Sequence, residues 1–247
     1  MRHKNLADRL VAHRGYMHRC PENTLPSLKA ALDAGAAYIE FDLQMNKDHD
    51  LVVIHDDSFI RTAGIDQSVF DCTSAQCLEI SVHYPKLFSD TFNPTPVFLL
   101  QDLLELLVQY PNASAMVEIK RQSLDYWGLE LVMGKLLAQL KPHHAQCVLI
   151  SFSVEAIEYT QQHSDLQTGW IFNNYDDKRR QRAASLGADF LITNHKGLPK
   201  GQAPWPEFKR WMLYDIMRPE LAIEYSEMGV ELIETADIKG LRDALTA

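Results

Sequence analysis

Four short segments of the chain place imidazole, carboxylate or basic side chains within, or directly after, an apolar strand-like run. They are His13-Arg14-Gly15, Glu40-Phe41-Asp42, His55-Asp56 and Glu118-Ile119-Lys120. In the second and fourth segments the charged residues are two positions apart, so both side chains lie on one face of a strand. Charged side chains inside a sheet-based fold are costly unless they are paired or bind a metal. We therefore expect the four segments to meet at one site.

The three acidic residues within these runs, Glu40, Asp42 and Glu118, are candidate metal ligands. If they converge, an all-oxygen ligand set without cysteine favours Mg²⁺ or Ca²⁺ over zinc. One divalent cation would reduce the repulsion among the carboxylates and attract an anionic substrate. In the alternative interpretation the three carboxylates face outward and are separately solvated or ion-paired.

The two histidines, His13 and His55, are candidate acid and base catalysts. One imidazole can remove a proton from an attacking oxygen while the other protonates a leaving oxygen, and each contribution is on the order of 10²–10⁴ in rate. Arg14 and Lys120 offer the donors and positive charge that bind a phosphoryl group. Together with a carboxylate-held cation, these residues indicate cleavage of a phosphodiester. The sequence does not indicate which histidine acts first as the base.

Apolar runs rich in β-branched residues recur along the whole chain and predict nine strands. They are Leu10–Ala12, Tyr38–Leu43, Leu51–Ile54, Ala115–Ile119, Cys147–Phe152, Gly169–Phe172, Asp189–Thr193, Trp211–Tyr214 and Glu231–Ile233. Segments with helical periodicity separate most of them: Leu99–Gln109, Tyr126–Leu140, Val154–Gln162, Asp176–Leu186 and Glu220–Met228. This alternation indicates a parallel sheet covered by helices, and eight of the strands fit a TIM (βα)8 barrel. The alternative is an open doubly wound sheet, which usually carries a glycine-rich phosphate loop, and neither common loop motif occurs in this sequence.

A hairpin accounts for the ninth strand. Only seven residues separate Leu43 from Leu51, which is too few for a helical crossover between parallel strands. A hairpin centred near Asp48-His49 would make Asp42 face His55 across the two strands.

We expect a single TIM-barrel domain over residues 1–247, with an inserted lobe at about residues 57–96. Glycines follow three predicted helices, at positions where a left-handed C-cap belongs, and a strand-like run follows each glycine: Gly35, Gly187 and Gly229. This repeated junction favours one continuous domain. The segment 57–96 mixes polar and aromatic residues without a long period. The Pro/Gly-rich segment Lys196–Phe208 is predicted to be a long loop at the rim of the active site.

The composition argues against several classes of function. Among 247 residues the chain carries 24 Lys and Arg against 33 Asp and Glu, a net charge of −9. This balance argues against a nucleic-acid partner and against stable association with a membrane. The segment Met1–Arg14 lacks the apolar core of a signal peptide, and no apolar run is long enough to span a bilayer. We therefore expect a cytoplasmic protein with a small-molecule substrate; the sequence does not indicate an oligomeric state.

The same motifs carry a resemblance to a known family through their order and spacing. After His13-Arg14-Gly15, five residues precede Pro21-Glu22-Asn23-Thr24, and this pattern resembles the HRG…PENT opening of glycerophosphodiester phosphodiesterases. The likeness is dense from Val11 to Gly64, returns at Pro96 and Glu118, and thins after Phe152. Later signatures of the family are matched in order by Glu40-Phe41-Asp42, Val53-Ile54-His55-Asp56, Arg61-Thr62 and Glu118-Ile119-Lys120.

The resemblance implies a TIM barrel with a small insertion after the His-Asp motif. It also implies a divalent-metal enzyme that hydrolyses glycerophosphodiesters to glycerol 3-phosphate and an alcohol, through attack of the glycerol 2-hydroxyl and a cyclic phosphate that water opens. Phe152, at a strand end, and Trp205, in the proline-rich loop, are further candidates for contact with substrate. The implied roles are acid and base for His13 and His55, ligands of one Mg²⁺ or Ca²⁺ for Glu40, Asp42 and Glu118, and phosphate contacts for Arg14 and Lys120.

The sequence departs from the family pattern at three places that concern the substrate pocket. The usual Trp-Thr-Val-Asn run reads Trp211-Met212-Leu213-Tyr214, the usual Thr-Asp-x-Pro becomes Glu234–Ile238 without proline, and Arg-Thr-Thr-x-Gly is shortened to Arg61–Gly64. Glu234 would make the pocket more acidic and favour a cationic alcohol such as choline. Two alternatives stay open: a lysophospholipase D-like phosphodiesterase, which needs an apolar groove at the barrel mouth, and a catalytically silent barrel that binds a phosphoester.

Overall fold

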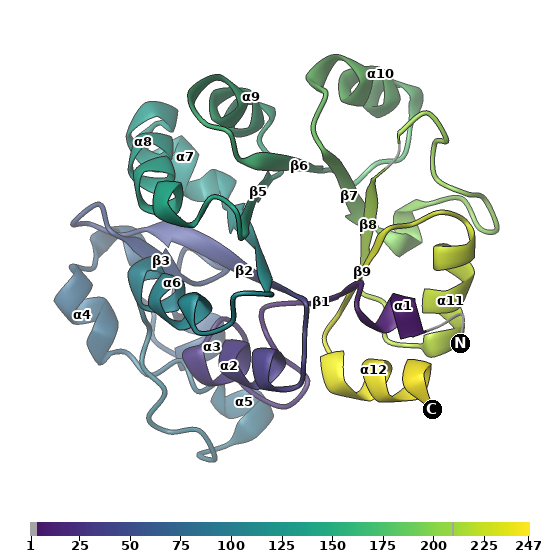
Figure 1. The fold of residues 1–247 in the computed structure, drawn as a ribbon. Coiled ribbons are helices and arrows are strands. Elements are labelled where there is room, and N and C mark those ends of the chain that lie inside the picture. Colours follow the sequence, from purple (N-terminus) through teal and green to yellow (C-terminus); the bar gives the residue numbers. More distant parts are fainter. Residues whose placement is uncertain (1–3, 209) are drawn as a thin grey trace.

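Eight parallel strands close into a ring, and helices cover its outer side (Figure 1). The computed structural model describes residues 4–208 and 210–247. Around the ring the strands are β1 (Leu10–Ala12), β2 (Tyr38–Met45), β4 (Ser114–Ile119), β5 (Cys147–Ser151), β6 (Gln167–Ile171), β7 (Phe190–Asn194), β8 (Trp211–Tyr214) and β9 (Leu232–Thr235). Pairing of β9 with β1 closes the ring, which confirms the predicted TIM (βα)8 barrel.

Helices and short turns connect the strands. They are α1 (Lys4–Ala7), α2 (Leu25–Asp33), α3 (Ile60–Ala63), η1 (Val69–Asp71), α4 (Ser74–Glu79), α5 (Pro85–Phe88), α6 (Leu100–Val108), α7 (Arg121–Trp127), α8 (Leu129–Leu140), η2 (Lys141–His143), α9 (Val154–His163), α10 (Asp177–Leu186), η3 (His195–Gly197), α11 (Pro219–Glu227) and α12 (Ile238–Thr246). The glycines predicted to follow α2, α10 and α11 all have positive φ. The helix expected over Tyr126–Leu140 is divided at Gly128, whose φ of 89° separates α7 from α8.

The loop between β7 and β8 lacks an α-helix in its described part. After the η3 turn the chain runs through the Pro/Gly-rich segment predicted for Lys196–Phe208. In Figure 1 this loop lies on the outer side of β7 and β8, close to α10 and α11.

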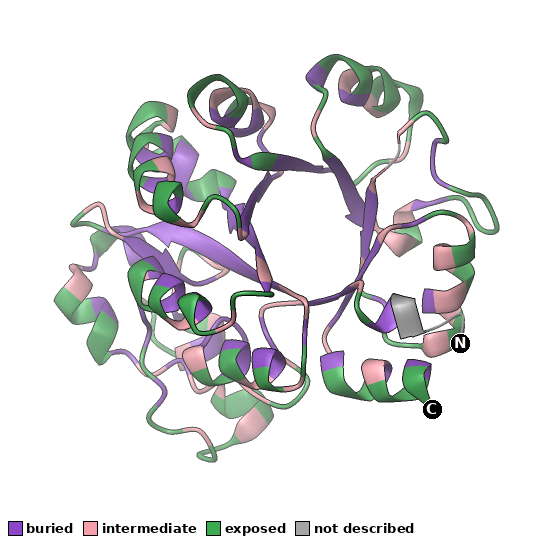
Figure 2. Cartoon of the chain, viewed as in Figure 1, coloured by how far each residue is buried: buried purple, intermediate pink, exposed green. Residues whose placement is uncertain are grey.

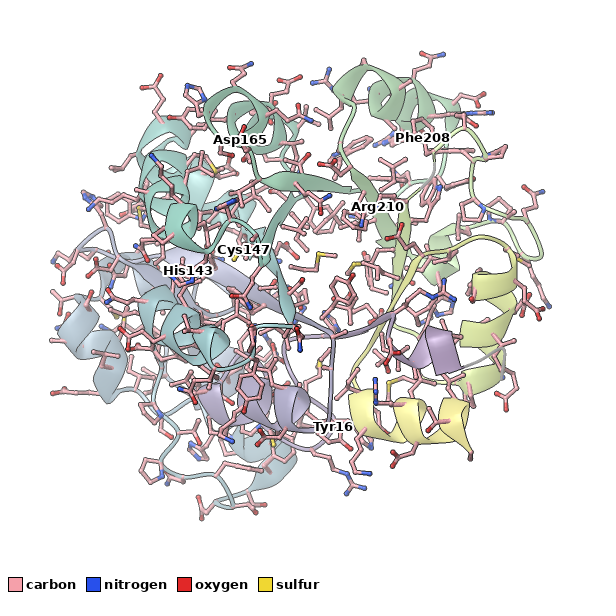
Figure 3. All side chains as sticks on the ribbon, viewed as in Figure 1. Tyr16, His143, Cys147, Asp165, Phe208 and Arg210 are labelled. Atoms are coloured by element: carbon pink, nitrogen blue, oxygen red, sulfur yellow. The ribbon has the colours of Figure 1, made fainter. Side chains whose placement is uncertain are left out.

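The strands alternate between an outer face that packs under the helices and an inner face that fills the barrel. On β2, Ile39, Phe41 and Leu43 belong to the large cluster shared with the helices, so Glu40 and Asp42 face inward at the alternate positions. The strands are mostly buried, and exposure is concentrated on the outer sides of the helices (Figure 2). Side chains occupy the interior of the ring, and Cys147 and Arg210 lie at its edge (Figure 3). The inner cluster is apolar: Val11, Met116, Val148, Ile150, Ile171, Phe190, Ile192, Met212 and Leu232.

Gly169 of β6 is required by the close packing of this inner cluster. A Cβ atom at this position would lie 2.9 Å from the Ile150 side chain and 2.8 Å from that of Ile192. The absence of a side chain therefore lets the two isoleucines fill the centre of the barrel.

The ninth strand, β3 (Leu51–Val53), lies outside the ring and pairs with β2 in the antiparallel direction, as predicted. The predicted register is wrong by one residue. Leu43 pairs with Val53, and the Ile54 N–H donates to the Asp42 carbonyl at 3.0 Å, so His55 is not opposite Asp42. The cause is the turn, where the Asn46 side chain accepts hydrogen bonds from the backbone N–H groups of Asp48 and Asp50 and closes a loop centred on Asp48.

The residues expected to form an inserted lobe hold α3, η1, α4 and α5 (Figure 1). They surround a second apolar cluster, which includes Phe59, Val69 and Cys77 and extends to Val52 of β3. This segment packs beside β2, so it stands next to the residues that follow β3.

None of the described helices is both long enough and apolar enough to cross a bilayer. The segment Met1–Arg14, in which the sequence predicts no signal peptide, includes residues 1–3, and these lie outside the described residues.

Candidate active site

A cavity of about 190 Å³ opens at the end of the barrel where the parallel strands terminate. One side of its lining is charged and comes from the ends of β1, β2, β4 and β9 and from the residues after β3. The other side is mostly apolar and comes from β5 to β8. The lining residues are His13, Arg14, Glu40, His55, Glu118, Lys120, Ile150, Phe152, Ile171, Ile192, Met212, Tyr214, Asp215 and Glu234.

A sharp turn after β1 positions His13 and Arg14 at this cavity. Arg14 and Gly15 both have positive φ, and a Cβ atom at Gly15 would lie 2.6 Å from the backbone of Ser27. Only glycine allows the turn to approach α2 so closely. The Arg14 N–H donates to Glu40 Oε2 at 2.9 Å, which ties the turn to β2.

Asp42 is the most deeply buried of the carboxylates and lies between two cations. Its Oδ1 is 3.1 Å from Lys120 Nζ, and its Oδ2 is 3.1 Å from Arg14 Nε. Asn23 holds it from a third side, because its amide donates to Asp42 Oδ2 at 2.8 Å and its oxygen accepts from the Asp42 N–H. Lys120 also donates to Glu118 at 2.7 Å.

The electrostatics divide these carboxylates into two kinds. Burial alone would raise the pKa of Asp42, but the charges of Arg14 and Lys120 hold it well below its usual range. Burial and the charge of Asp42 raise the pKa of Glu40 well above its usual range. Burial and the same neighbouring charge raise the pKa of Glu118, even though Lys120 opposes the shift. The charges of Arg14 and Lys120 therefore stabilise the charged form of Asp42 but do not offset the burial of Glu40 and Glu118.

Glu40, Asp42 and Glu118 fit a divalent cation. Each offers an oxygen within 4.8 Å of the others, and opposite oxygens around a Ca²⁺ ion are separated by about twice the 2.3–2.6 Å bond length. Glu40 Oε1 is buried and has no hydrogen-bond partner among the described residues, so one ligand position is already desolvated and unpaired. The predicted convergence of these three carboxylates is what the structure shows, and the outward-facing alternative is wrong.

His55 lies at the other side of the cavity and is held by a chain of ion pairs. Its Nδ1 is 2.6 Å from Asp56 Oδ1, and Asp56 Oδ2 accepts from Arg61 Nε at 2.6 Å. Arg61, from α3 of the inserted segment, also donates twice to Glu22, which in turn binds Arg14 at 2.7 Å. Burial opposes the shift, but His55 and Arg61 lower the pKa of Asp56 to about 2. Asp56 therefore remains charged, fixes the orientation of the His55 ring and leaves its Nε2 free of this contact.

Burial lowers the pKa of His13 to about 4, and the charge of Arg14 acts in the same direction. The His13 imidazole is therefore neutral near pH 7 and can accept a proton. This gives the two histidines different environments: His13 is held neutral by burial, whereas the Nδ1 of His55 lies 2.6 Å from the charged carboxylate of Asp56.

We expect the His13 imidazole of the metal-free protein to titrate near pH 4 rather than near the ordinary value of 6.5. An NMR pH titration of labelled protein, with the signal assigned through the variant His13→Gln, measures this directly. Between these two pH values the unfolded chain binds a proton at His13 that the folded chain does not. The contribution of His13 to the free energy of unfolding therefore decreases as the pH falls. A titration midpoint at 6.5 or above would contradict the description of His13.

The structure brings together almost all of the residues predicted to form the site. Phe152 lines the apolar side of the cavity, as expected for contact with the substrate. Trp205 does not reach the cavity. Its ring is 8% exposed and stacks on Tyr175 and Phe172 at centroid distances of 4.1 and 5.8 Å, on the outer side of β6 and β8. A large aromatic side chain in a loop gains more from this packing than from an exposed position at the rim.

Several site residues were not predicted to take part. Tyr214 and Asp215 line the cavity at the end of β8, at the altered Trp211–Tyr214 run. Burial and the charge of Glu234 raise the pKa of Tyr214 to about 12, so its phenol stays protonated and can donate a hydrogen bond. Arg61 and Glu22 belong to motifs that were recognised in the sequence. The chain of ion pairs that they form between His55 and Arg14 depends on the fold.

The fold and the cavity define a TIM-barrel protein whose strands end, at their C-terminal side, in a cavity lined by two histidines and by carboxylates that could hold a metal ion. The chain belongs to the glycerophosphoryl diester phosphodiesterase family, whose model matches residues 13–210. Among its relatives, a glycerophosphodiester phosphodiesterase of Bacillus altitudinis is 33% identical over 122 residues, which are 49% of each chain. One from Caldanaerobacter subterraneus is 33% identical over 137 residues, 55% of this chain and 53% of that protein. The matched region thus spans about half the length of these curated relatives.

Solved structures show the same fold over nearly the whole chain. A phosphodiesterase from Oleispira antarctica, in complex with the product sn-glycerol-3-phosphate, superposes with a TM-score of 0.85 at 20% identity and covers 97% of both chains. A putative glycerophosphoryl diester phosphodiesterase from Silicibacter pomeroyi has a TM-score of 0.81 at 21% identity and covers 96% of this chain and 92% of that one. At these identities the likeness establishes the TIM barrel.

Proposed function

We propose that this protein hydrolyses glycerophosphodiesters to glycerol 3-phosphate and an alcohol, with His13 as base, His55 as acid and a cation held by Glu40, Asp42 and Glu118. The observation that carries the proposal is the joint lining of one small cavity by two histidines in different environments beside a partly uncompensated carboxylate cluster. Membership of the family and the product named in the complex of the Oleispira antarctica protein support the same substrate class.

The charged side of the cavity binds the phosphate. Arg14 presents a guanidinium and Lys120 an ammonium group, both at the cavity wall. A divalent cation at the carboxylates, Mg²⁺ or Ca²⁺ for an all-oxygen ligand set, would supply further positive charge against the phosphate oxygens. Glu22 and Asn23 orient Arg14 and Asp42 without contacting the substrate themselves.

The two histidines move the protons. The neutral His13 imidazole accepts the proton of the attacking hydroxyl, which on a glycerophosphodiester is the glycerol 2-hydroxyl. His55, whose ring is oriented by Asp56, donates a proton to the oxygen of the departing alcohol. Water then opens the resulting cyclic phosphate with the two roles reversed, which leaves glycerol 3-phosphate and restores both protonation states.

The experiment that tests the proposal is a panel of deacylated glycerophosphodiesters, with choline, ethanolamine, inositol and glycerol as the alcohol. Release of glycerol 3-phosphate is measured by a coupled dehydrogenase assay, with and without chelator. Metal-dependent release from at least one substrate supports the proposal. Thermal stabilisation by these compounds without any release would instead indicate a catalytically silent, phosphoester-binding barrel.

The size of the cavity distinguishes this function from a lysophospholipase D-like activity. Its volume of about 190 Å³ is below the range of about 300–1,000 Å³ that is usual for drug-sized ligands. The apolar wall formed by Ile150, Phe152 and Met212 suits the short glycerol carbon chain. We therefore expect kcat/KM for glycerophosphocholine to exceed that for 1-acyl-lysophosphatidylcholine by roughly tenfold or more. Equal or faster cleavage of the acylated substrate, measured below its critical micelle concentration, would favour the lysophospholipase D-like alternative.

A further inference from the structure

Glu234 is a further acidic residue that faces into the barrel, outside the cluster of Glu40, Asp42 and Glu118. It is the third residue of β9, pairs with Val11 of β1 and is 3% exposed. Neighbouring inward positions carry apolar side chains such as Val11, Ile192 and Met212. Bulky aliphatic residues are the usual filling of a TIM barrel, so an acidic residue here weakens the core unless something binds it.

In the described part of the chain, no basic side chain forms an ion pair with this carboxylate. Within the described residues, Glu234 Oε1 is buried and accepts no hydrogen bond, and the same is true of Glu40 Oε1. Glu40, Asp42, Glu118 and Glu234 are all buried carboxylates, and the cations beside them, Arg14 and Lys120, are already engaged by Glu22, Asp42 and Glu118. Glu234 is therefore a buried carboxylate at the cavity, and its Oε1 has no hydrogen-bond partner among the described residues.

His13, Glu40 and Glu234 lie close enough together to bind one ion. Each offers a ligand atom within 4.8 Å of the other two. Three donor atoms this close together can surround a single small ion, whereas the methyl groups of choline would hold them further apart. The expectation from the sequence that Glu234 favours a cationic alcohol stays a prediction, since Glu234 lines the cavity.

The donor set points to a different ion from that of the neighbouring cluster. Glu40, Asp42 and Glu118 offer only oxygen, which suits Mg²⁺ and Ca²⁺. An imidazole nitrogen with two carboxylates suits borderline ions, of which Zn²⁺ is the commonest in proteins. The His13 imidazole offers a nitrogen lone pair to such an ion from within the same group of donor atoms.

We propose that His13, Glu40 and Glu234 form a second cation site that binds Zn²⁺ or a similar borderline dication, with Glu40 shared between the two sites. An ion bound there takes the lone pair that His13 needs in order to accept a proton. Zinc binding at this site therefore inhibits hydrolysis. The inhibition rests on the function proposed above, whereas the binding does not.

The test counts bound zinc in the whole, tag-free protein after chelator treatment, by equilibrium dialysis at low micromolar Zn²⁺ followed by elemental analysis. At this zinc concentration we expect wild type to bind one more equivalent of zinc than Glu234→Leu. The reason is that the variant's affinity for zinc at the second site should be at least about tenfold lower. The control is Glu231→Gln, which removes a carboxylate paired with Arg210 just before β9, at the opposite end of the strand. This control should bind as much zinc as wild type.

Leucine is an ordinary barrel residue, so Glu234→Leu should fold, and the melting temperature of the metal-free variant should equal or exceed that of wild type. Equal zinc stoichiometry and affinity in wild type and Glu234→Leu would overturn the second site.

A kinetic arm separates this inference from the proposed function. In saturating Ca²⁺, we expect zinc to inhibit wild type and the Glu231→Gln control at concentrations at least about tenfold lower than those that inhibit Glu234→Leu. Identical inhibition of all three proteins by zinc would overturn the proposal that zinc inhibits hydrolysis by binding His13. Failure of every glycerophosphodiester to react would contradict the proposed function alone, because the zinc count does not depend on turnover.

Discussion

Replacement of His13 or His55 by alanine is expected to lower kcat for a glycerophosphodiester by roughly 10²–10⁴-fold while the protein remains folded. Both side chains line the cavity and are not part of the apolar core, so their loss leaves no cavity inside the barrel. The matched control is His144→Ala, an exposed histidine after α8, which should keep its rate within about twofold. Folding is checked by circular dichroism and melting temperature. A loss below about tenfold in either active-site variant would contradict the acid–base assignment.

The leaving group distinguishes the roles of the two histidines. An alkoxide leaves only if it is protonated, whereas a nitrophenolate leaves without a proton. A glycerol phosphate ester of p-nitrophenol should therefore restore much of the lost rate in His55→Ala but not in His13→Ala. The opposite pattern would exchange the acid and base roles, and equal behaviour of both variants would contradict a division of labour between them.

Removal of divalent cations is expected to abolish hydrolysis, and addition of Mg²⁺ or Ca²⁺ to restore it. Burial raises the pKa of Glu40 and of Glu118, so without a cation their charged forms are disfavoured, and the cavity lacks the positive charge that a bound cation would supply to an anionic phosphodiester. Activity after exhaustive chelation that equals that of the untreated protein would contradict a metal-dependent site.

Glu118→Gln tests the ligand set itself. Glu118 contacts Lys120 at 2.7 Å and belongs to the cluster with Glu40 and Asp42. The variant keeps the shape of the side chain but removes one ligand charge, so the concentration of metal needed for half-maximal activity should rise by roughly 10–100-fold. Glu105→Gln, on the exposed side of α6, should leave this concentration unchanged. An unchanged metal requirement in Glu118→Gln would remove this residue from the site.

Much of the fold followed from local patterns in the sequence. The inward side chains of β2 and β4 were predictable because charged residues alternate with apolar ones at Glu40-Phe41-Asp42 and Glu118-Ile119-Lys120. The closure of eight strands followed from the repeated strand–helix alternation and from the short Leu43–Leu51 connection, which allows only a hairpin. The convergence of these charged residues then followed from the parallel direction of the strands.

Details that depend on side-chain contacts could not be predicted. The hairpin register is set by hydrogen bonds of Asn46 inside its own turn, and strand periodicity does not reveal this. The helical pattern continues through Gly128 although the backbone does not. Trp205 lies in a rim loop by sequence but packs on Tyr175 in space.

The membership of Glu40 in both groups of candidate ligands could also not be predicted from the sequence. Glu40 was predictable as one of three metal ligands, but its closeness to both His13 and Glu234 depends on the pairing of β1 with β2 on one side and with β9 on the other. Residues 40 and 234 are far apart along the chain, and only the completed ring brings them together. The same closure explains how a substitution near the C-terminus alters a site whose motifs lie in the first half of the sequence.

The most direct test of the central claim is a crystal structure of the protein with Ca²⁺ and glycerol 3-phosphate. We expect one cation bonded to oxygens of Glu40, Asp42 and Glu118 at about 2.3–2.6 Å, with the phosphorus atom between His13 and His55. A cation bound elsewhere, or a phosphate that neither histidine can reach, would contradict this expectation.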